Sequence, residues 1–174
     1  MRILAILVLG LLTAACGFQL RGQAKLPFET LYVAIPETSP IGIDLRRNIV
    51  AGTNTRLVPT PAEAKAIFEL VTEERSKAIL SFDSAGQVRE YQLRYRLAFR
   101  VRDGRGRDYL PRSEIRLTRD ISYSSTQVLS KESEEQLLYR EMQNDMVQQI
   151  LRRLAAAPAE PIAFEAGAKD AAAR

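Results

Sequence analysis

Arginine side chains recur at alternating positions along two neighbouring segments of this chain. Six of them are candidate anion-binding residues: Arg94, Arg96, Arg100, Arg102, Arg112 and Arg116. A guanidinium group holds a phosphate or a carboxylate through two parallel hydrogen bonds, so an array of them on one face of a sheet fits an anionic lipid or an acidic protein surface. A solvated face without any ligand explains the same pattern, and the sequence leaves both interpretations open.

The positive charge is concentrated in this part of the chain. Residues 89–119 contain ten Arg and four acidic residues, a local charge of +6. The whole chain of 174 residues carries 25 Lys and Arg against 21 Asp and Glu, a net charge of +4, so everything outside this segment sums to −2. The aromatic side chains alternate onto the opposite face of the same strands, where they cannot stack on bases, and this argues against nucleic acid as the partner.

Few residues are suited to catalysis or metal binding. The chain has no His and a single Cys, which removes the commonest general base and the usual metal ligands. Its carboxylate clusters, Glu73-Glu74 and the acids of residues 132–135, have the spacing of surface and helix-capping residues. Gly104-Arg105-Gly106 is too short for a dinucleotide motif and indicates a turn. We therefore predict no catalytic residues, no cofactor, no metal and no enzymatic activity.

The N-terminus has the layout of a secretory signal. A basic start is followed by ten apolar residues, Ile3 to Leu12, and by small residues just before Cys16. The apolar run is too short to stay in a bilayer as a spanning helix. Residues 1–15 thus form a predicted lipoprotein signal peptide, and Cys16 is the predicted lipidation site. A plain secreted protein with a stray Cys is the alternative. By resemblance to bacterial lipoproteins, Gly17 in place of Asp favours the outer membrane.

The mature chain alternates between strand and helix signals. Residues 30–35 predict a short strand, and Ser39-Pro40 begins an amphipathic helix that ends at Gly52. A second helix begins at Ser130 or Ser133 and stops before Pro158. Residues 16–29 are predicted to be a linker, residues 30–156 a single domain, and residues 157–174 a disordered tail rich in Ala and Pro.

The middle of the chain predicts long strands. Every second residue from Tyr91 to Val101 is apolar, and Ile115, Leu117, Ile121 and Tyr123 share one face of a following strand that Arg119 interrupts. Before them, alternation places these residues on one apolar face: Phe68, Leu70, Thr72, Ser76, Ala78, Leu80 and Phe82. Two amphipathic helices can cover one face of such a sheet, so we predict an α+β two-layer sandwich.

Short motifs in a fixed order resemble one protein family. They are Cys16-Gly17-Phe18-Gln19-Leu20-Arg21-Gly22, Arg46-Arg47-Asn48, Glu90-Tyr91-Gln92-Leu93, Glu141-Met142 and Leu151-Arg152-Arg153-Leu154. In order and spacing they resemble the LPS-assembly lipoprotein family LptE over most of residues 16–155. The resemblance implies two helices packed on one face of a four-stranded, mostly antiparallel sheet.

The resemblance also implies a role. Members of the family are plugs and assembly partners of the LptD β-barrel at the outer membrane, lipid-anchored on its periplasmic side, and contact lipopolysaccharide. Lys131 matches a basic family position in the loop before the second helix. A second basic position, at the turn of residues 83–86, holds Ser84 here, and Lys77 or Arg89 could substitute for it. The alternative is another outer-membrane lipoprotein adaptor, which recruits an envelope protein through its acidic second helix.

Overall fold

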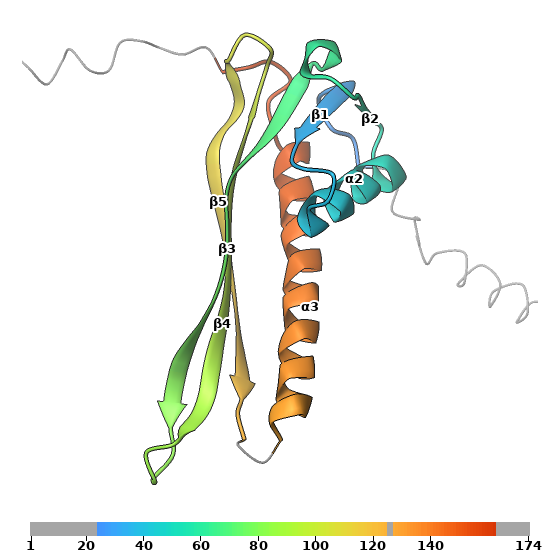
Figure 1. Ribbon diagram of the computed structural model, residues 1–174. Helices are drawn as coiled ribbons and strands as arrows, with labels where there is room; N and C mark the ends of the chain where they lie inside the picture. The colour runs from blue at the N-terminus through green and yellow to red at the C-terminus, as the bar shows by residue number, and fades with distance from the viewer. Residues whose placement is uncertain (1–23, 125–126, 163–174) are drawn as a thin grey trace, which may run out of the picture.

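The computed structural model describes residues 24–124 and 127–162 (Figure 1). The predicted signal peptide, Cys16 and residues 163–174 of the predicted tail lie outside this part. The described elements follow in chain order: β1 (Thr30–Ala34), α2 (Pro40–Gly52), β2 (Arg56–Leu57), a 3-10 turn (Pro61–Glu63), β3 (Ala66–Phe82), β4 (Val88–Arg102), β5 (Asp108–Ser122) and α3 (Val128–Ala155).

The sheet has five strands in the order β2-β1-β3-β4-β5, with both helices on one side of it (Figure 1). β1 is parallel to β2 and β3, whereas β3, β4 and β5 form an antiparallel meander. The α+β sandwich with two helices is confirmed, but the four-stranded, mostly antiparallel sheet is wrong in detail. The additional strand is β2, which falls within residues 56–59, a segment that the sequence also indicates as a short strand.

α2 begins and ends where the sequence predicts. Ser39 caps it by accepting a hydrogen bond from the Gly42 amide, and Pro40 occupies the first turn. Thr53 closes the other end through its amide and its hydroxyl, both of which donate to the carbonyl of Ile49. The apolar stripe expected from the spacing faces the core.

The strands of the meander are 17, 15 and 15 residues long, so each extends for about 50 Å. The two connecting turns have the same hydrogen-bond pattern. The Asp83 carboxylate accepts hydrogen bonds from the amides of residues 85 and 87, and the Asp103 carboxylate does the same for residues 105 and 107. Each turn then needs a left-handed residue, Gly86 with φ +77° and Gly106 with φ +84°.

Gly106→Ala should lower the free energy of unfolding by about 1 kcal/mol, because a Cβ is unfavourable at this positive φ even though no atom lies within 4 Å of it. Gly104→Ala is the matched control two residues away, where φ is not in the left-handed region and the space is equally open. Urea unfolding of both variants measures the difference. Equal stability of the two variants would contradict the proposed strain.

A β-bulge at Val71 changes which side chains of β3 face the helices. The pairing with β4 shifts between Leu70 and Thr72. Beyond that point Glu73 is opposite Leu97 and Arg75 is opposite Tyr95, both of which are buried under the helices. The prediction that Thr72, Ser76 and Ala78 share the face of Phe68 is therefore wrong, and the pairing shifts again on either side of Ser81, before Phe82. Simple alternation cannot reveal an inserted residue.

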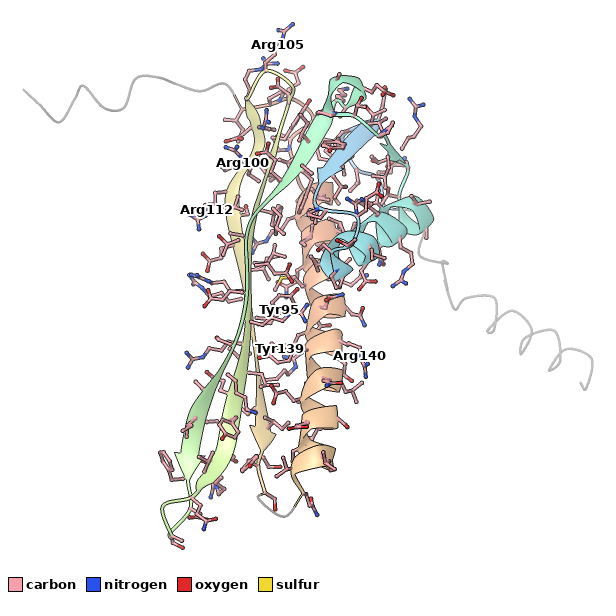
Figure 2. All side chains as sticks on the ribbon, viewed as in Figure 1. Tyr95, Arg100, Arg105, Arg112, Tyr139 and Arg140 are labelled. Carbon is pink, nitrogen blue, oxygen red and sulfur yellow. The ribbon has the colours of Figure 1, made fainter. Side chains whose placement is uncertain are left out.

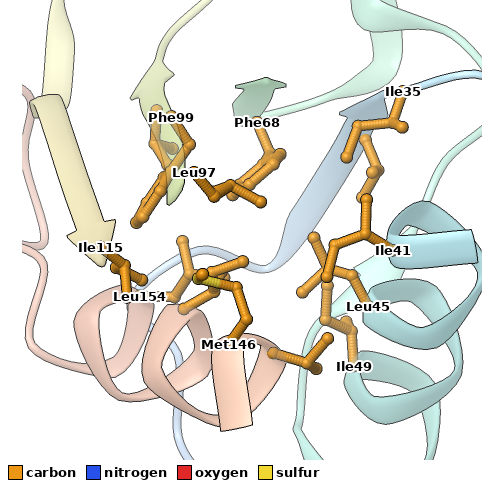
Figure 3. Close-up of a cluster of buried hydrophobic side chains, with 14 of the residues drawn as sticks. Ile35, Ile41, Leu45, Ile49, Phe68, Leu97, Phe99, Ile115, Met146 and Leu154 are labelled. Atoms are coloured by element: carbon orange, nitrogen blue, oxygen red, sulfur yellow. The ribbon is translucent and has the colours of Figure 1, made fainter. Parts of the chain in front are cut away.

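The apolar core lies between the sheet and the two helices (Figure 3). On the sheet, the rings of Phe68 and Phe99 stack with their centroids 5.1 Å apart. α2 and α3 close the core with residues that are fully buried: Ile41, Leu45, Ile49, Met142, Met146, Ile150 and Leu154. The aromatic side of the long strands is thus covered by the helices, as predicted.

Polar contacts replace the apolar core farther along α3. Tyr95 is fully buried, yet its hydroxyl donates to Glu73 at 2.7 Å and accepts from Arg75 at 3.2 Å. Arg75 also donates to Gln143 of α3 at 2.7 Å. Burial, reinforced by the Glu73 carboxylate, raises the pKa of Tyr95 well above its usual range. Arg119, which interrupts the apolar face of β5, pairs with Asp145 of α3 at 2.8 Å.

Three boundaries differ from the predicted ones. The end of the predicted linker, residues 16–29, belongs to the domain, because Leu26 and Phe28 are buried in the core. α3 begins at Val128, before either predicted serine, so Lys131 lies within the helix rather than in the loop before it. The first residues of the predicted tail are attached to the domain. Ala157 is buried, and the Ile162 amide donates to the carbonyl of Asp108 at the start of β5.

Candidate functional site

The six predicted arginines lie on the side of the sheet that the helices leave open. Figure 2 shows Arg100 and Arg112 pointing away from α3. The β4 members alternate with buried core residues, and Arg116 is opposite Arg96 in the pairing of β4 with β5. We call this surface the arginine face and define it by these residues: Arg94, Arg96, Arg100, Arg102, Arg112 and Arg116.

Glutamates on the same side of the sheet neutralise part of the arginine face. Glu74 pairs with Arg96 at 2.7 Å, and Glu114 pairs with Arg116 at 2.6 Å. Among the described residues, neither Arg94 nor Arg112 has an ion pair. The sequence revealed the arginines but not these ion pairs. The bulge in β3 hides that Glu74 faces Arg96, and Glu114 lies on the next strand, β5.

Glu69 bridges Arg100 and Arg102, with ion pairs of 2.6 and 2.7 Å. Burial by itself would raise the pKa of Glu69, but the hydrogen bonds from Arg102 and Arg100 outweigh it and hold this pKa below its usual value of 4.5. A carboxyl group with a lowered pKa stabilises the fold above its unfolded pKa, and this contribution disappears as the pH falls through the folded value.

Glu69→Gln should therefore lower the free energy of unfolding at pH 7 by about 1 kcal/mol. The difference from wild type should shrink steadily as the pH falls below the usual value of 4.5, because both chains are then uncharged at this position. Denaturant unfolding between pH 7 and pH 3 measures it, with the exposed Glu141→Gln as control. A difference that persists unchanged at pH 3 would rule out the ion pairs as its cause.

The two arginines without ion pairs each line a hollow on the open side of the sheet. Arg94 borders one of about 350 Å³, together with Arg96, Arg116, Glu74 and Ser76. The second hollow, of about 620 Å³, lies where β1 ends and leaves one edge of β3 without a neighbouring strand. It is lined by Ala34, Glu69, Leu70, Val71, Arg100 and Arg112. Both hollows can accept a carboxylate or phosphate group next to a cation that has no other charged partner among the described residues.

Lys131 lies on the helix side of the sheet, so the structure does not bring it together with the arginine face. Its ammonium group, with 17% of the side chain exposed, donates to Ser122 at 2.9 Å and to Glu134 at 2.8 Å. A hollow of about 190 Å³ beside it has these lining residues: Lys77, Tyr91, Ile121, Ser122, Tyr123, Val128, Lys131, Glu132 and Glu135. We call this hollow the Lys131 cleft.

Lys77 is the second cation of the Lys131 cleft. It pairs with Glu135 at 2.6 Å and lies 4.3 Å from the centre of the Tyr91 ring. The hydrogen bond to Glu135 raises the pKa of Lys77, so the side chain stays charged at neutral pH. Arg89, the other proposed substitute for the missing basic residue, pairs with Glu90 at 3.3 Å and does not line the cleft.

The described residues contain neither a cluster that could hold a metal ion nor a helix that could span a membrane. Nowhere in residues 24–124 and 127–162 do three or more His, Cys, Asp or Glu side chains gather in a way that could hold a metal ion. No helix in these ranges has the length and apolar character needed to span a membrane. The arrangement supports binding through charged surfaces.

Comparison with known proteins gives one consistent result. A family model described as LptE, lipopolysaccharide-assembly, matches residues 28–154. The LPS-assembly lipoprotein LptE of Photorhabdus laumondii is 28% identical over 146 residues, covering 83% of this chain and 79% of that protein. The protein of the same name from Yersinia enterocolitica is 29% identical over 147 residues, covering 83% and 70%.

Solved structures agree with this assignment. The solution structure of an uncharacterized lipoprotein B from Nitrosomonas europaea is 43% identical, with a TM-score of 0.70, and covers 80% of this chain and 91% of that one. The crystal structure of rare lipoprotein B from Shewanella oneidensis, at 24% identity and a TM-score of 0.64, covers 73% and 94% and supports the fold alone.

Proposed function

Because this chain belongs to the lipopolysaccharide-assembly family LptE, we propose that it is a lipid-anchored, non-catalytic partner of an LptD-type β-barrel. In this role it sits in the barrel as a plug, assists barrel assembly, and helps to deliver lipopolysaccharide to the outer membrane. Its anchor is the lipidated Cys16, which holds it on the periplasmic side.

The separation of the two sheet faces is the observation that carries the proposal. The helices cover one face and complete an apolar core without any partner. The other face presents the arginine face along strands of about 50 Å. The lumen of an outer-membrane barrel is polar and hydrated, so a plug needs a hydrophilic exterior and a self-contained core.

The charge balance of the arginine face suits a protein partner. Its ion pairs keep most guanidinium groups satisfied when water is excluded, which limits the desolvation cost of docking. Arg94 and Arg112 remain available for carboxylates on the barrel wall, and long-range attraction to acidic groups would accelerate docking. We therefore propose this surface as the one that meets the barrel.

Contact with lipopolysaccharide is a separate part of the proposal. The Lys131 cleft combines two ammonium groups with the apolar side chains of Tyr91, Ile121 and Val128. Ammonium groups bind phosphate, and apolar neighbours suit the lipid part of the same molecule. When a phosphate binds, the ion pairs of Lys131 with Glu134 and of Lys77 with Glu135 would have to break.

Depletion of the chain in cells tests the proposal. We expect misassembled barrel and less lipopolysaccharide at the cell surface, both restored by the wild-type gene. Normal barrel folding and normal surface lipopolysaccharide after complete depletion would refute the role. Restoration by a Cys16→Ala form that is exported but not lipidated would refute only the need for the anchor.

A further inference from the structure

The outward face of α2 carries apolar side chains that nothing among the described residues covers. Ile43 is 49% exposed and Val50 is 65% exposed, while the opposite stripe of the helix is fully buried. Together with Arg47 they follow the spacing i, i+4, i+7, which places all three on one side of the helix. Figure 1 shows α2 on the helix side of the sheet, beside α3. We call these three residues the outer α2 face.

The chain enters the fold beside the end of this helix. The amide of Ala24 donates to the carbonyl of Gly52 at 2.8 Å, and the amide of Leu26 donates to the Asn54 side chain at 2.8 Å. Cys16 precedes Ala24 by eight residues. An extended chain spans at most about 3.6 Å per residue, so lipid on Cys16 would keep this end of α2 within about 29 Å of the bilayer.

The outer α2 face carries a cation of its own, and a second cation lies at the end of the helix. Arg47 is 67% exposed even though it pairs with Asp44 at 2.7 Å. Lys25 follows Ala24, which is hydrogen-bonded to Gly52; it is exposed and has no ion pair with another described residue. Exposed apolar side chains flanked by Lys and Arg are typical of surfaces that lie in the headgroup region of a membrane with anionic lipids.

We propose that the outer α2 face docks on the bilayer that holds the lipid of Cys16, with Ile43 and Val50 in the headgroup region and with Lys25 and Arg47 on anionic headgroups. This inference rests on the proposed lipid anchor. Two apolar side chains are far too few for a stable dimer, which needs about 1,200 Å² of buried surface. The lipid on Cys16 already holds the protein at the bilayer, so docking of the outer α2 face costs little further entropy. Weak contacts with the membrane are then sufficient.

Tryptophan fluorescence can test the docking because the natural chain contains no Trp. Single-reporter forms Ile43→Trp and Val50→Trp of the full lipidated protein would be placed in vesicles of phosphatidylethanolamine and phosphatidylglycerol that carry brominated acyl chains. A ring about 5–10 Å below the surface should lose about half of its emission to the bromine atoms. Leu129→Trp is the control, because Leu129 is 81% exposed at the start of α3.

The control lies far from the docking surface. Leu129 is 14 residues from Gln143, whose side chain contacts Asp44 of α2, and these residues span about 21 Å of helix. Its reporter should keep nearly all its emission. Adding Val50→Asp to the Ile43→Trp form should restore the emission of the reporter, whereas adding Leu137→Asp on α3 should not.

Flotation of the vesicles separates the two possible failures. Protein that floats with the vesicles but shows equal emission at positions 43, 50 and 129 would overturn the docking and leave the anchor intact. Protein that does not float would overturn the anchor and the docking with it. Quenching at positions 43 and 50 alone, in floated protein, is the result we expect.

Discussion

Phe99→Ala should lower the free energy of unfolding by about 3–5 kcal/mol, the largest stability effect that we expect from one substitution. Phe99 is fully buried and its ring stacks on that of Phe68. Truncation removes this contact and leaves a cavity in the packed core. Urea unfolding followed by circular dichroism measures the loss.

Phe82→Ala makes the same chemical change at the far end of β3, where the ring is 59% exposed. It should change stability by about 0.5 kcal/mol or less. Equal losses in the two variants would mean that the core does not lie where the structure places it. A domain has only about 5–15 kcal/mol of stability, so the Phe99 variant should also be recovered from cells in smaller amounts.

Arg94→Glu combined with Arg112→Glu should reduce recovery of the barrel by about tenfold or more, the largest functional effect that we expect, because like charges facing one another across an interface cost several kcal/mol. These two arginines have no ion pair with a described residue. Their reversal therefore leaves the ion pairs between the other arginines and their glutamates intact. Reversal of Arg96 would leave Glu74 without its partner, and reversal of Arg100 would leave Glu69 with Arg102 alone, so either change would confuse stability with binding.

The measurement is purification of the tagged protein from detergent-solubilised membranes, with the copurified barrel quantified. Arg140→Glu combined with Arg152→Glu gives the same change in net charge on exposed positions of α3. Figure 2 shows Arg140 on the side of α3 away from the sheet. Barrel recovery should stay near wild type for this control. An equal loss in both double variants would show that net charge matters and the arginine face does not.

Helix α2 and strand β4 were predicted correctly, because each has a regular spacing of apolar residues. The spacing of Ile41, Leu45 and Ile49 predicted the buried side of α2, and Ser39 with Pro40 predicted its start. Continuous alternation from Tyr91 to Val101 predicted both the buried and the open face of β4, because the period of two is uninterrupted there.

The errors arise where tertiary structure overrides local pattern. The bulge at Val71 inserts one residue and turns Arg75 and Lys77 toward α3, although their alternation with apolar neighbours placed them on the other face. Arg119 appeared to break an apolar face, and its partner Asp145 is 26 residues away on another element. A hydrogen-bonded pair that distant leaves no signal in a single sequence.

Only part of the candidate site can be predicted from the sequence, because the remaining contacts join residues that are far apart in the chain. Alternation identified the arginines of β4 as neighbours, but it could not pair Arg102 with Glu69, which is 33 residues earlier in the chain. Lys131 was placed in a loop because serine residues offered later helix starts, whereas α3 begins at Val128 without a side-chain cap. Lys131 of α3 and Lys77 of β3 line the same cleft only in the folded protein, so the sequence alone could not bring them together.

Site-specific photo-crosslinking in cells tests the central claim most directly. A photoreactive amino acid at position 112 of the arginine face should form an adduct of this protein with the LptD-type barrel, and position 94 should give the same adduct. The account is contradicted if both positions form no barrel adduct while the tagged protein still copurifies with the barrel, or if they crosslink to a different envelope protein.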